Sequence, residues 1–380
     1  MDPKRIRKNS ESPAAGAMDD CVLPRDMMHS IITRLPVKSV HRFKSVCKPL
    51  RDVFSSPEFA KMHRAQFPQN PENESVVIYA YKSNYDYTIS LLKIKSNEEK
   101  KPTKLVIPFP QFSYIADFVG CCNGLLCMAF RSHFVALWNP ALNNMFKCIP
   151  LADLEIEDPM MVSIGFGYNE EEDDFKVIII ADLEIDKKER VEVYSANSNS
   201  WITIDVGFQF TPLRFRNDVI VNGSPYWLAV VDQKRVMMVC FDVRKMVFKV
   251  FPLPNHISMG VGDFLFVDLK GDLGLLVCKQ KKDETVLPLD IWVFDDVGKN
   301  EWTKSRSFGP IELKVHRFLQ CLGNGKTLIG ECLEDGKVFV FDTESGDVKE
   351  IVIDKAEKGT FQVYGHTESL AYIKGMETLL

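Results

Sequence analysis

The chain has 380 residues, of which 46% are hydrophobic and 26% charged, with a formal net charge of −5. This composition is typical of a folded protein with more than one core, and it gives no sign of the strongly basic face of a nucleic-acid binder. No apolar run approaches the roughly 18 residues of a membrane helix, and residues 1–20 lack the apolar core of a secretory signal. We therefore expect no nucleic-acid or membrane partner and a location in the cytoplasm, the nucleus or both.

Residues 1–18 are polar and lack periodicity, which predicts a disordered tail. A small basic cluster lies within this segment: Lys4, Arg5, Arg7 and Lys8. A solvated tail is favoured over a nuclear-import signal, because such clusters are usually no more than solvated charge.

Residues 19–66 predict a small helical module. The apolar residues of the first helix recur at three-to-four spacing and share one face: Leu23, Met27, Ile31 and Ile32. Pro36 ends that helix, Ser39 can cap a second, and Pro49 begins a third that continues through Met62. So small a unit exposes apolar surface, which indicates a protein partner rather than a self-contained core.

From about residue 75 the hydrophobic period changes to two, and one pattern recurs: an apolar strand, a polar turn and a second strand. The paired runs are Ile89–Ile94 with Lys104–Phe109, Val135–Trp138 with Met145–Ile149, Val191–Tyr194 with Ser200–Ile204, Met237–Asp242 with Met246–Phe251, Ile291–Phe294 with Glu301–Thr303, and Val338–Phe341 with Asp347–Val352. A period of about 45–55 residues is typical of propeller blades. The fold class predicted is therefore a small α-helical module followed by an all-β propeller of six blades, with seven as the alternative.

The first repeat lacks a full preceding strand pair, whereas the tail has strands to spare at Phe361–Tyr364 and Ser369–Ile373. We expect this tail to complete the first blade, because closing the ring removes exposed sheet edges.

The helical segment resembles an F-box of the plant type. The resemblance rests on three stretches: Leu23-Pro24-Arg25-Asp26, Ile31 to Val40, and Arg42-Phe43-Lys44-Ser45-Val46-Cys47-Lys48. The rest of the chain resembles the kelch-like F-box-associated domain of that family. Its supporting stretches are Cys122 to Cys127, Trp138 to Ala141, Gly165 to Tyr168, Val191 to Ser195, and Val221 to Trp227.

The resemblance implies an F-box at 19–66 and an F-box-associated propeller at 67–380. It also implies a non-catalytic subunit of an SCF-type ubiquitin ligase: the F-box docks on a Skp-type adaptor, which connects to a cullin and a RING subunit, and the propeller recruits a protein target. The implied adaptor contacts are Leu23, Pro24, Ile31, Ile32, Leu35, Pro36, Val37, Val40, Phe43, Val46 and Cys47. Leu50 stands where the family usually has Trp, which implies a smaller buried area and weaker adaptor binding.

A search for chemistry predicts no catalytic residue, no metal site and no cofactor. Cys121, Cys122 and Cys127 lack zinc spacing and are interpreted as core residues. Gly323–Thr327 resembles part of a phosphate loop but is interpreted as a hairpin turn, and the acidic run Glu170–Asp174 as a solvated turn. Trp201 and Trp302 occupy equivalent places in their repeats, where blades pack on one another. The three histidines of the helical segment are expected at its surface or interface: His29, His41 and His63.

Residues that contact a target remain unassigned, and the candidate loops are Asn84–Tyr87, Arg131–His133 and Thr211–Asn217. Two alternatives stay open: a propeller-fold hydrolase or carbohydrate-binding protein, and an adaptor-binding scaffold that works outside ubiquitin ligases.

Overall fold

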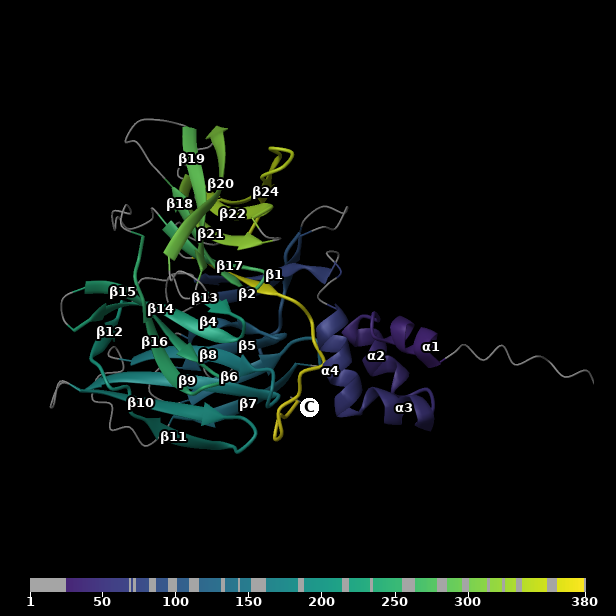
Figure 1. The fold of residues 1–380 in the computed structure, drawn as a ribbon. Helices are drawn as coiled ribbons and strands as arrows, with labels where there is room; N and C mark the ends of the chain where they lie inside the picture. The colour runs from purple at the N-terminus through teal and green to yellow at the C-terminus, as the bar shows by residue number, and fades with distance from the viewer. Residues whose placement is uncertain are drawn as a thin grey trace, which may run out of the picture.

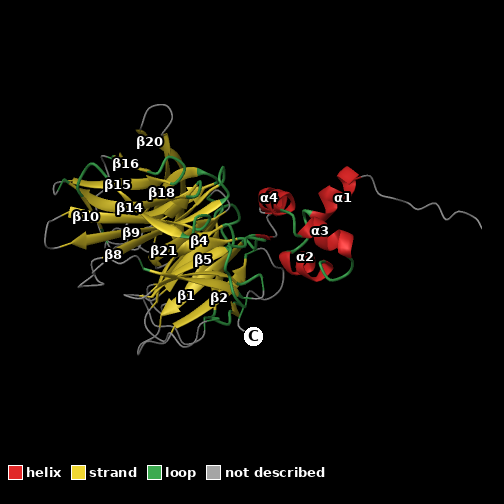
Figure 2. Cartoon of the chain, turned by 90° about the horizontal axis from the view of Figure 1, so that it is seen from below, coloured by secondary structure: helices red, strands yellow, loops and turns green. Residues whose placement is uncertain are grey.

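A computed structural model describes residues 25–67, 70, 73–81, 87–94, 101–108, 116–130, 134–142, 144–151, 162–183, 188–213, 219–232, 235–254, 264–278, 286–295, 301–312, 315–322, 325–332, 337–353 and 361–378. In these residues a module of four helices precedes six β-sheets arranged as a propeller. The module lies to one side of the propeller in two perpendicular views (Figures 1 and 2). None of the described helices is long and apolar enough to cross a membrane.

The helices are short and follow one another closely. They are α1 (Arg25–Ile32), α2 (Val37–Phe43), α3 (Lys48–Phe54) and α4 (Pro57–Gln66). Two sequence expectations were wrong here. The second helix begins at Val37, with Pro36 rather than Ser39 at its N-cap. The expected third helix is two helices, because Ser56 accepts a hydrogen bond from the Phe59 N–H (3.2 Å) and caps a new helix that starts at Pro57.

Each blade is an antiparallel sheet. The first is ordered β25 (Phe361–His366), β1 (Ser75–Tyr81), β2 (Tyr87–Lys93) and β3 (Thr103–Lys104). The second contains β4 (Ala116–Cys122), β5 (Leu125–Phe130), β6 (Phe134–Asn139) and β7 (Met145–Pro150). The third contains β8 (Val162–Asn169), β9 (Asp174–Leu183), β10 (Lys188–Ser195) and β11 (Ser200–Ile204), from inside to outside.

The fourth blade differs in its innermost strand, which is divided in two. β12 (Phe210–Pro212) and β13 (Val219–Val221) both pair with β14 (Ser224–Val231), which is followed by β15 (Arg235–Asp242) and β16 (Val247–Phe251). The fifth contains β17 (Phe264–Leu269), β18 (Asp272–Cys278), β19 (Val286–Asp295) and β20 (Glu301–Glu312). The sixth contains β21 (Val315–Leu322), β22 (Thr327–Cys332), β23 (Val338–Asp342) and β24 (Val348–Ile351).

The repeat predicted from the sequence is confirmed, since the paired runs fall on the third and fourth strands of the six blades. In the first blade the outer strand is only Thr103–Lys104, so the expected strand Lys104–Phe109 was wrong beyond its first residue. The ring closes as expected through β25, which pairs with β1 in register from Ser75 opposite His366 to Ala80 opposite Phe361. The expected strand at Ser369–Ile373 was wrong, because this segment crosses over the end of the second blade without forming a regular strand.

Blade packing explains why the period-two pattern is incomplete in the middle strands. Every side chain of β5 and β6 is buried, since both faces of these strands are covered by other blades. The inner strands approach closely where glycine allows it. A Cβ on Gly165 would lie 2.3 Å from the Trp227 ring, and one on Gly167 would lie 2.4 Å from the Gly223 carbonyl oxygen. Gly165, Gly167 and Gly223 therefore set the distance between the third and fourth blades.

Candidate functional site

The helical module has a small core of its own. Its fully buried apolar side chains are Ile32, Val37, Val40, Phe54 and Phe59. Phe54 and Phe59 meet edge to face with ring centroids 5.0 Å apart. This core comes from all four helices, so it fixes their packing and leaves the remaining apolar residues for the surface.

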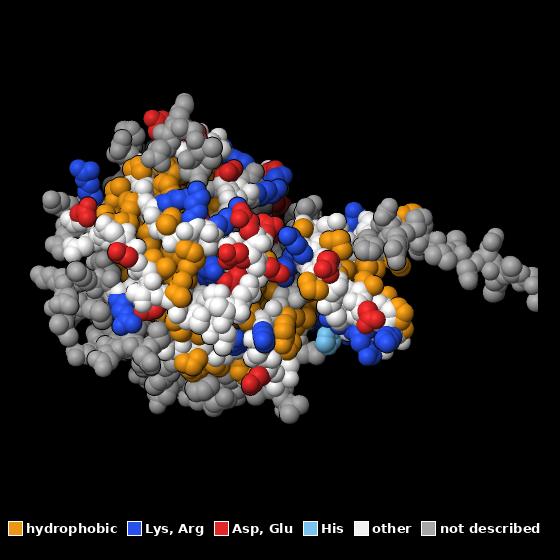
Figure 3. All heavy atoms as spheres, turned by 60° about the horizontal axis from the view of Figure 1, so that its bottom comes forward, with side chains coloured by type: hydrophobic (Ala, Val, Ile, Leu, Met, Phe, Trp, Pro, Cys, Tyr) orange, Lys and Arg blue, Asp and Glu red, His pale blue; other side chains and the backbone are white. Residues whose placement is uncertain are grey.

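The outer surface of the module is unusually apolar. Six of the twelve large hydrophobic side chains that are exposed among the described residues lie on or between α1, α2 and α3, namely Met27, Met28, Ile31, Phe43, Val46 and Val53. Figure 3 shows hydrophobic side chains gathered on this part of the molecule. We call this set the apolar docking face. So many apolar side chains on so small a unit indicate a protein-binding surface.

The implied adaptor residues fall into groups. Exposed at the surface are Ile31, Pro36, Phe43, Val46 and Cys47, and Leu35 is partly buried. Buried in the module's own core are Ile32, Val37 and Val40, which a partner could not touch without moving the helices. Leu23 and Pro24 lie outside the described residues. The predicted adaptor contacts omitted Met27, Met28 and Val53. They could have been found from the sequence, because the module has more apolar residues than so small a core can bury.

Leu50 is partly buried and packs against the core of the module. Leu50, which stands in place of the family's usual Trp, therefore lies against the module's core and is not one of the exposed side chains of the docking face. Its effect on adaptor affinity stays a prediction.

His63 is fully buried within the helical module, so its expected position at the surface or interface was wrong. Its Nε2 lies 2.8 Å from the Leu35 carbonyl oxygen, and its ring stacks on Phe67 with centroids 4.8 Å apart. Burial lowers the pKa of His63, which favours the neutral ring. The side chain ties α4 to the connection between α1 and α2. His41 is exposed as expected, and the His29 side chain lies outside what the structure describes.

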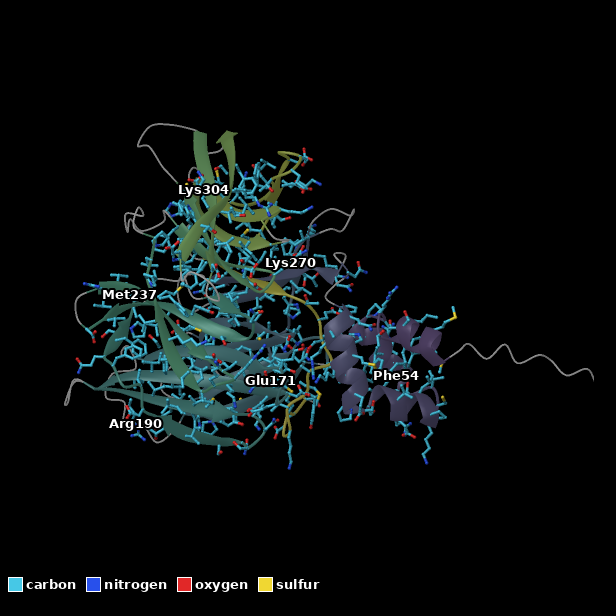
Figure 4. The ribbon with its side chains drawn as sticks, in the orientation of Figure 1. Phe54, Glu171, Arg190, Met237, Lys270 and Lys304 are labelled. Atoms are coloured by element: carbon cyan, nitrogen blue, oxygen red, sulfur yellow. The ribbon has the colours of Figure 1, made fainter. Side chains whose placement is uncertain are left out.

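A salt bridge joins the module to the propeller. The Arg64 guanidinium of α4 donates to Asp173 in the turn between β8 and β9 at 2.7 Å, and it lies 5.7 Å from the centre of the Tyr168 ring. The Tyr168 hydroxyl donates to the same carboxylate at 2.6 Å. Burial is the main reason that the pKa of Tyr168 is raised. Figure 4 labels Glu171 of this turn on the side of the propeller nearest the helices.

The acidic run Glu170–Asp174 was therefore wrongly interpreted as only a solvated turn. Asp173 binds Arg64, and Asp174 is buried. The Asp174 carboxylate accepts hydrogen bonds from Lys176 Nζ (2.7 Å), Ser195 Oγ (2.6 Å) and the Asn197 N–H (2.9 Å). These bonds hold the two turns of the third blade together, which gives Arg64 a fixed partner.

A second contact between the two halves is apolar. Ala141 and Leu142, between β6 and β7, and Leu370, after β25, share one buried cluster with the core of the module. In antiparallel blades, the turn after the first strand and the turn after the third strand lie at the same end. Asp173 and Leu142 stand in such turns, so the module attaches to one end of the propeller.

The inner strands surround a central cavity of about 750 Å³. Its partly buried apolar lining includes Val119, Cys121, Cys122, Ile164, Ile220, Phe264 and Leu319. Cys127 is buried as expected, whereas Cys121 and Cys122 face this cavity. Burial raises the pKa of Cys122 to about 12, so the thiol stays protonated. Within the described residues no group of His, Cys, Asp and Glu could hold a metal ion.

The candidate target loops fall mostly outside the described residues, which include only Tyr87 and Thr211 to Leu213 from them. Tyr81 pairs with Tyr87 where β1 ends and β2 begins, and Phe130 pairs with Phe134 where β5 ends and β6 begins. Both pairs lie at the end of the propeller opposite the helical module, because Ser75 and His366 mark the other end of the first blade.

The family models that match the chain agree with this architecture. Residues 21–62 match the family model described as F-box domain, and residues 74–373 match the one described as F-box associated beta propeller domain. An F-box/kelch-repeat protein of Arabidopsis thaliana is 29% identical over 296 residues, which cover 74% of this chain and 78% of the relative. A putative F-box protein of the same plant is 24% identical over 366 residues, which cover 93% of this chain and 90% of the relative. Among solved structures, a crystal structure of a nidogen/laminin complex matches with a TM-score of 0.46 and 11% identity, covering 78% of this chain and 99% of that one.

Proposed function

The chain belongs to the family of proteins that join an F-box to an F-box associated beta propeller domain, and from this premise we propose that it is the target-recognition subunit of an SCF-type ubiquitin ligase. F-box proteins generally act as recognition subunits and leave ubiquitin transfer to the other subunits of the ligase. In this proposal the described chain supplies binding surfaces and no catalytic group, and it works in the cytoplasm, the nucleus or both.

The apolar docking face is the observation that carries the proposal. Its members lie outside the buried cluster that the four helices share with the propeller, so they remain available to a Skp-type adaptor. Transfer of apolar surface from water into an interface contributes about 25 cal/mol per Å² before the costs of association. We expect most of this energy from three exposed members of the face, namely Ile31, Phe43 and Val46, of which Val46 is 65% exposed. The adaptor in turn connects the chain to a cullin and a RING subunit.

The propeller is the target-binding half of the proposal. The helical module occupies one end of the blades through Arg64 and Leu370. We place the protein target at the opposite end, where the connections that follow β1 and β5 emerge. Loops on a rigid scaffold are where binding residues concentrate.

Co-expression with a Skp-type adaptor tests the proposal. Full-length protein and a deletion of residues 1–66 are each passed over size exclusion with the adaptor, and only the full-length chain is expected to co-elute at one-to-one. Folded full-length protein that ignores the adaptor overturns the proposal and brings forward the hydrolase or carbohydrate-binding alternative. A reconstituted ubiquitination assay with and without the cullin separates a ligase subunit from an adaptor-binding scaffold.

A further inference from the structure

Residues 367–378, here called the C-terminal strap, leave β25 at His366 and run between the propeller and the helices (Figure 1). The ring is already closed before the strap begins, because β25 pairs with β1 along its whole length. The strap contributes only an isolated bridge between Glu377 and Phe146 to the sheets. Closure of the propeller therefore does not explain why this segment is so well packed.

The side chains of the strap are buried in two different cores. Leu370 belongs to the cluster formed by the helical module, together with Ile32 and Phe59. Buried in the cluster between the second and third blades are Ala371, Ile373 and Met376. Tyr372, between these positions, is 55% exposed. One short segment thus packs against the helices with one side chain and against the propeller with three.

Polar contacts fix the path of the strap on the second blade. Asn139 is fully buried, and its Nδ2 donates to the carbonyl oxygens of Ser369 (3.1 Å) and Ala371 (2.8 Å). Its Oδ1 accepts from the Ala141 N–H at 3.0 Å, so the amide bonds both the strap and the turn that contacts the helices. A buried amide with all these partners specifies one arrangement, because any other leaves polar groups without partners.

The far end of the strap is equally fixed. Phe146 and Glu377 exchange two backbone hydrogen bonds of 2.9 and 2.8 Å. Lys147 Nζ donates to the Lys374 carbonyl oxygen at 2.8 Å and to Asn199 Oδ1 at 2.7 Å, which connects the strap to the third blade as well. Near its start, Ser369 Oγ donates to the Asn123 carbonyl oxygen. The strap is anchored to the propeller on both sides of Leu370.

Arg64 contacts the propeller separately from the strap, through Asp173 and Tyr168 of the third blade. Leu370 and Asp173 lie on different elements, so they hold the module at two places. One contact would allow the module to pivot in any direction, whereas a second contact at a separate place opposes most of that motion.

We propose that the C-terminal strap, acting together with the Arg64–Asp173 salt bridge, locks the F-box and the propeller into one rigid body and so sets the direction in which a bound target faces the adaptor. The consequence for the target rests on the function proposed above, whereas the locking itself does not. Leu370, Asn139, Arg64 and Asp173 are positioning residues in this scheme, since none of them needs to touch adaptor or target.

The test measures the distance between the two halves in the full-length chain, alone and with the adaptor. Fluorophores are attached through keto amino acids at Glu58 on α4 and Lys349 on β24, which are both exposed, and energy transfer is recorded on single molecules. The unaltered chain is expected to give one narrow population. The double variant Leu370→Ser with Arg64→Asp is expected to give a broad distribution of energy-transfer efficiencies in place of the narrow population. It is expected still to co-elute with the adaptor.

Three controls separate locking from general damage. Leu370→Met conserves volume and Tyr372→Ala changes an exposed strap residue, so both are expected to keep the narrow population. With Leu370 intact, the charge-exchanged variant Arg64→Asp with Asp173→Arg again pairs opposite charges. It is expected to show the narrow energy-transfer population of the unaltered chain. Thermal unfolding of the propeller monitors folding of every variant, including a chain that stops at His366.

A narrow population that survives in the double variant overturns the proposal, as does an equally broad one in the unaltered chain. Failure of the adaptor to bind the unaltered chain overturns the proposed function instead, and the measurement on the free protein still decides whether the strap locks the module.

Discussion

Trp201 and Trp302 make the same hydrogen bond in two different blades. Trp201 Nε1 donates to the Pro150 carbonyl oxygen at 3.1 Å, and Trp302 Nε1 donates to the Pro252 carbonyl oxygen at 2.8 Å. Each Trp is the second residue of the outermost strand of its blade. Pro150 is the last residue of the outermost strand of the preceding blade, and Pro252 directly follows that strand in the other case. The packing of blade on blade that their equivalent sequence positions predicted is confirmed at both places.

Replacing either Trp by Phe keeps an aromatic ring at the blade contact and removes the donor. We expect each substitution to lower the free energy of unfolding by about 1 kcal/mol, the usual net value of a hydrogen bond whose partner can turn to water. Denaturant titration of each variant measures this loss. Val247→Ala, on the exposed face of β16, is the matched surface control and is expected to change little. Equal free energies of unfolding for Trp302→Phe and the unaltered protein would show that the hydrogen bond from the Trp302 indole N–H does not stabilise the fold.

Gly223 and Gly346 have nearly the same backbone conformation, with φ of +76° and +77°, but different surroundings. A Cβ on Gly223 would lie 2.1 Å from the Tyr168 carbonyl oxygen, whereas one on Gly346 would meet nothing within 4 Å. Gly346→Ala is therefore expected to cost about 1 kcal/mol for the left-handed conformation alone. Gly223→Ala is expected to cost several times more, because the third and fourth blades must separate. Comparison of the two melting temperatures checks this, and similar losses would contradict the close approach.

Protonation of His366 is expected to destabilise the protein in mild acid. Its side chain is buried beside Ser75, with Nδ1 and Oγ 3.3 Å apart, and burial lowers the pKa of His366 to about 4. In the unfolded chain the pKa returns to about 6.5, so between these values the unfolded state binds the proton and the folded state does not. Stability is therefore present above pH 6.5 and falls as the pH drops toward 4, by about 3 kcal/mol in all.

Unfolding free energies measured between pH 7 and 4.5 test this slope, with His366→Asn as the comparison. Asn keeps a polar group near Ser75 and does not titrate, so the variant is expected to lose less stability over this range than the unaltered protein. Part of the slope is expected to remain, since burial lowers the pKa of His63 in the same direction. Parallel pH profiles for the two proteins would be the contrary result.

The apolar docking face can be tested with two valines of similar exposure. Val46 in the helical module is 65% exposed, and Val352 after β24 is 68% exposed. We expect Val46→Asp to reduce adaptor affinity at least tenfold, since a desolvated carboxylate in an interface costs more than about 1.4 kcal/mol. Val352→Asp is expected to leave the affinity unchanged. Titration calorimetry with a Skp-type adaptor measures both, and equal affinities would remove Val46 from the interface.

The propeller was largely predictable because its signal is local and repeated. In the second, third, fourth and sixth blades a short turn joins the third and fourth strands, so each pair can be recognised within about twenty residues of sequence. Closure through β25 was also predictable, since a first repeat without inner strands needs a partner from elsewhere. The divided inner strand of the fourth blade was not, because β12 and β13 are three residues each and carry little periodicity.

The joint between the halves was not predictable, because it depends on residues far apart in the chain. Arg64 and Asp173 are 109 residues apart, and nothing in either neighbourhood indicates the other. His63 appeared to be a surface residue because its helix is short and polar, whereas the rings of Phe59 and Phe67 enclose it in three dimensions. Helical spacing identifies apolar residues but does not tell whether they face a core or a partner. For this reason the sequence assigned three core residues to the adaptor surface: Ile32, Val37 and Val40.

The pairing of β25 with β1 has a consequence for synthesis of the protein. The F-box helices leave the ribosome first, while the strand that completes the first blade and the strap that follows it are made some 290 residues after β1 begins. A chain interrupted before β25 already carries the docking face but has an open ring, and its helical module lacks the contact with Leu370. Under the proposed function such a fragment would occupy an adaptor without a complete propeller, so we expect a premature stop late in the reading frame to act as a dominant inhibitor of the ligase rather than as a simple loss.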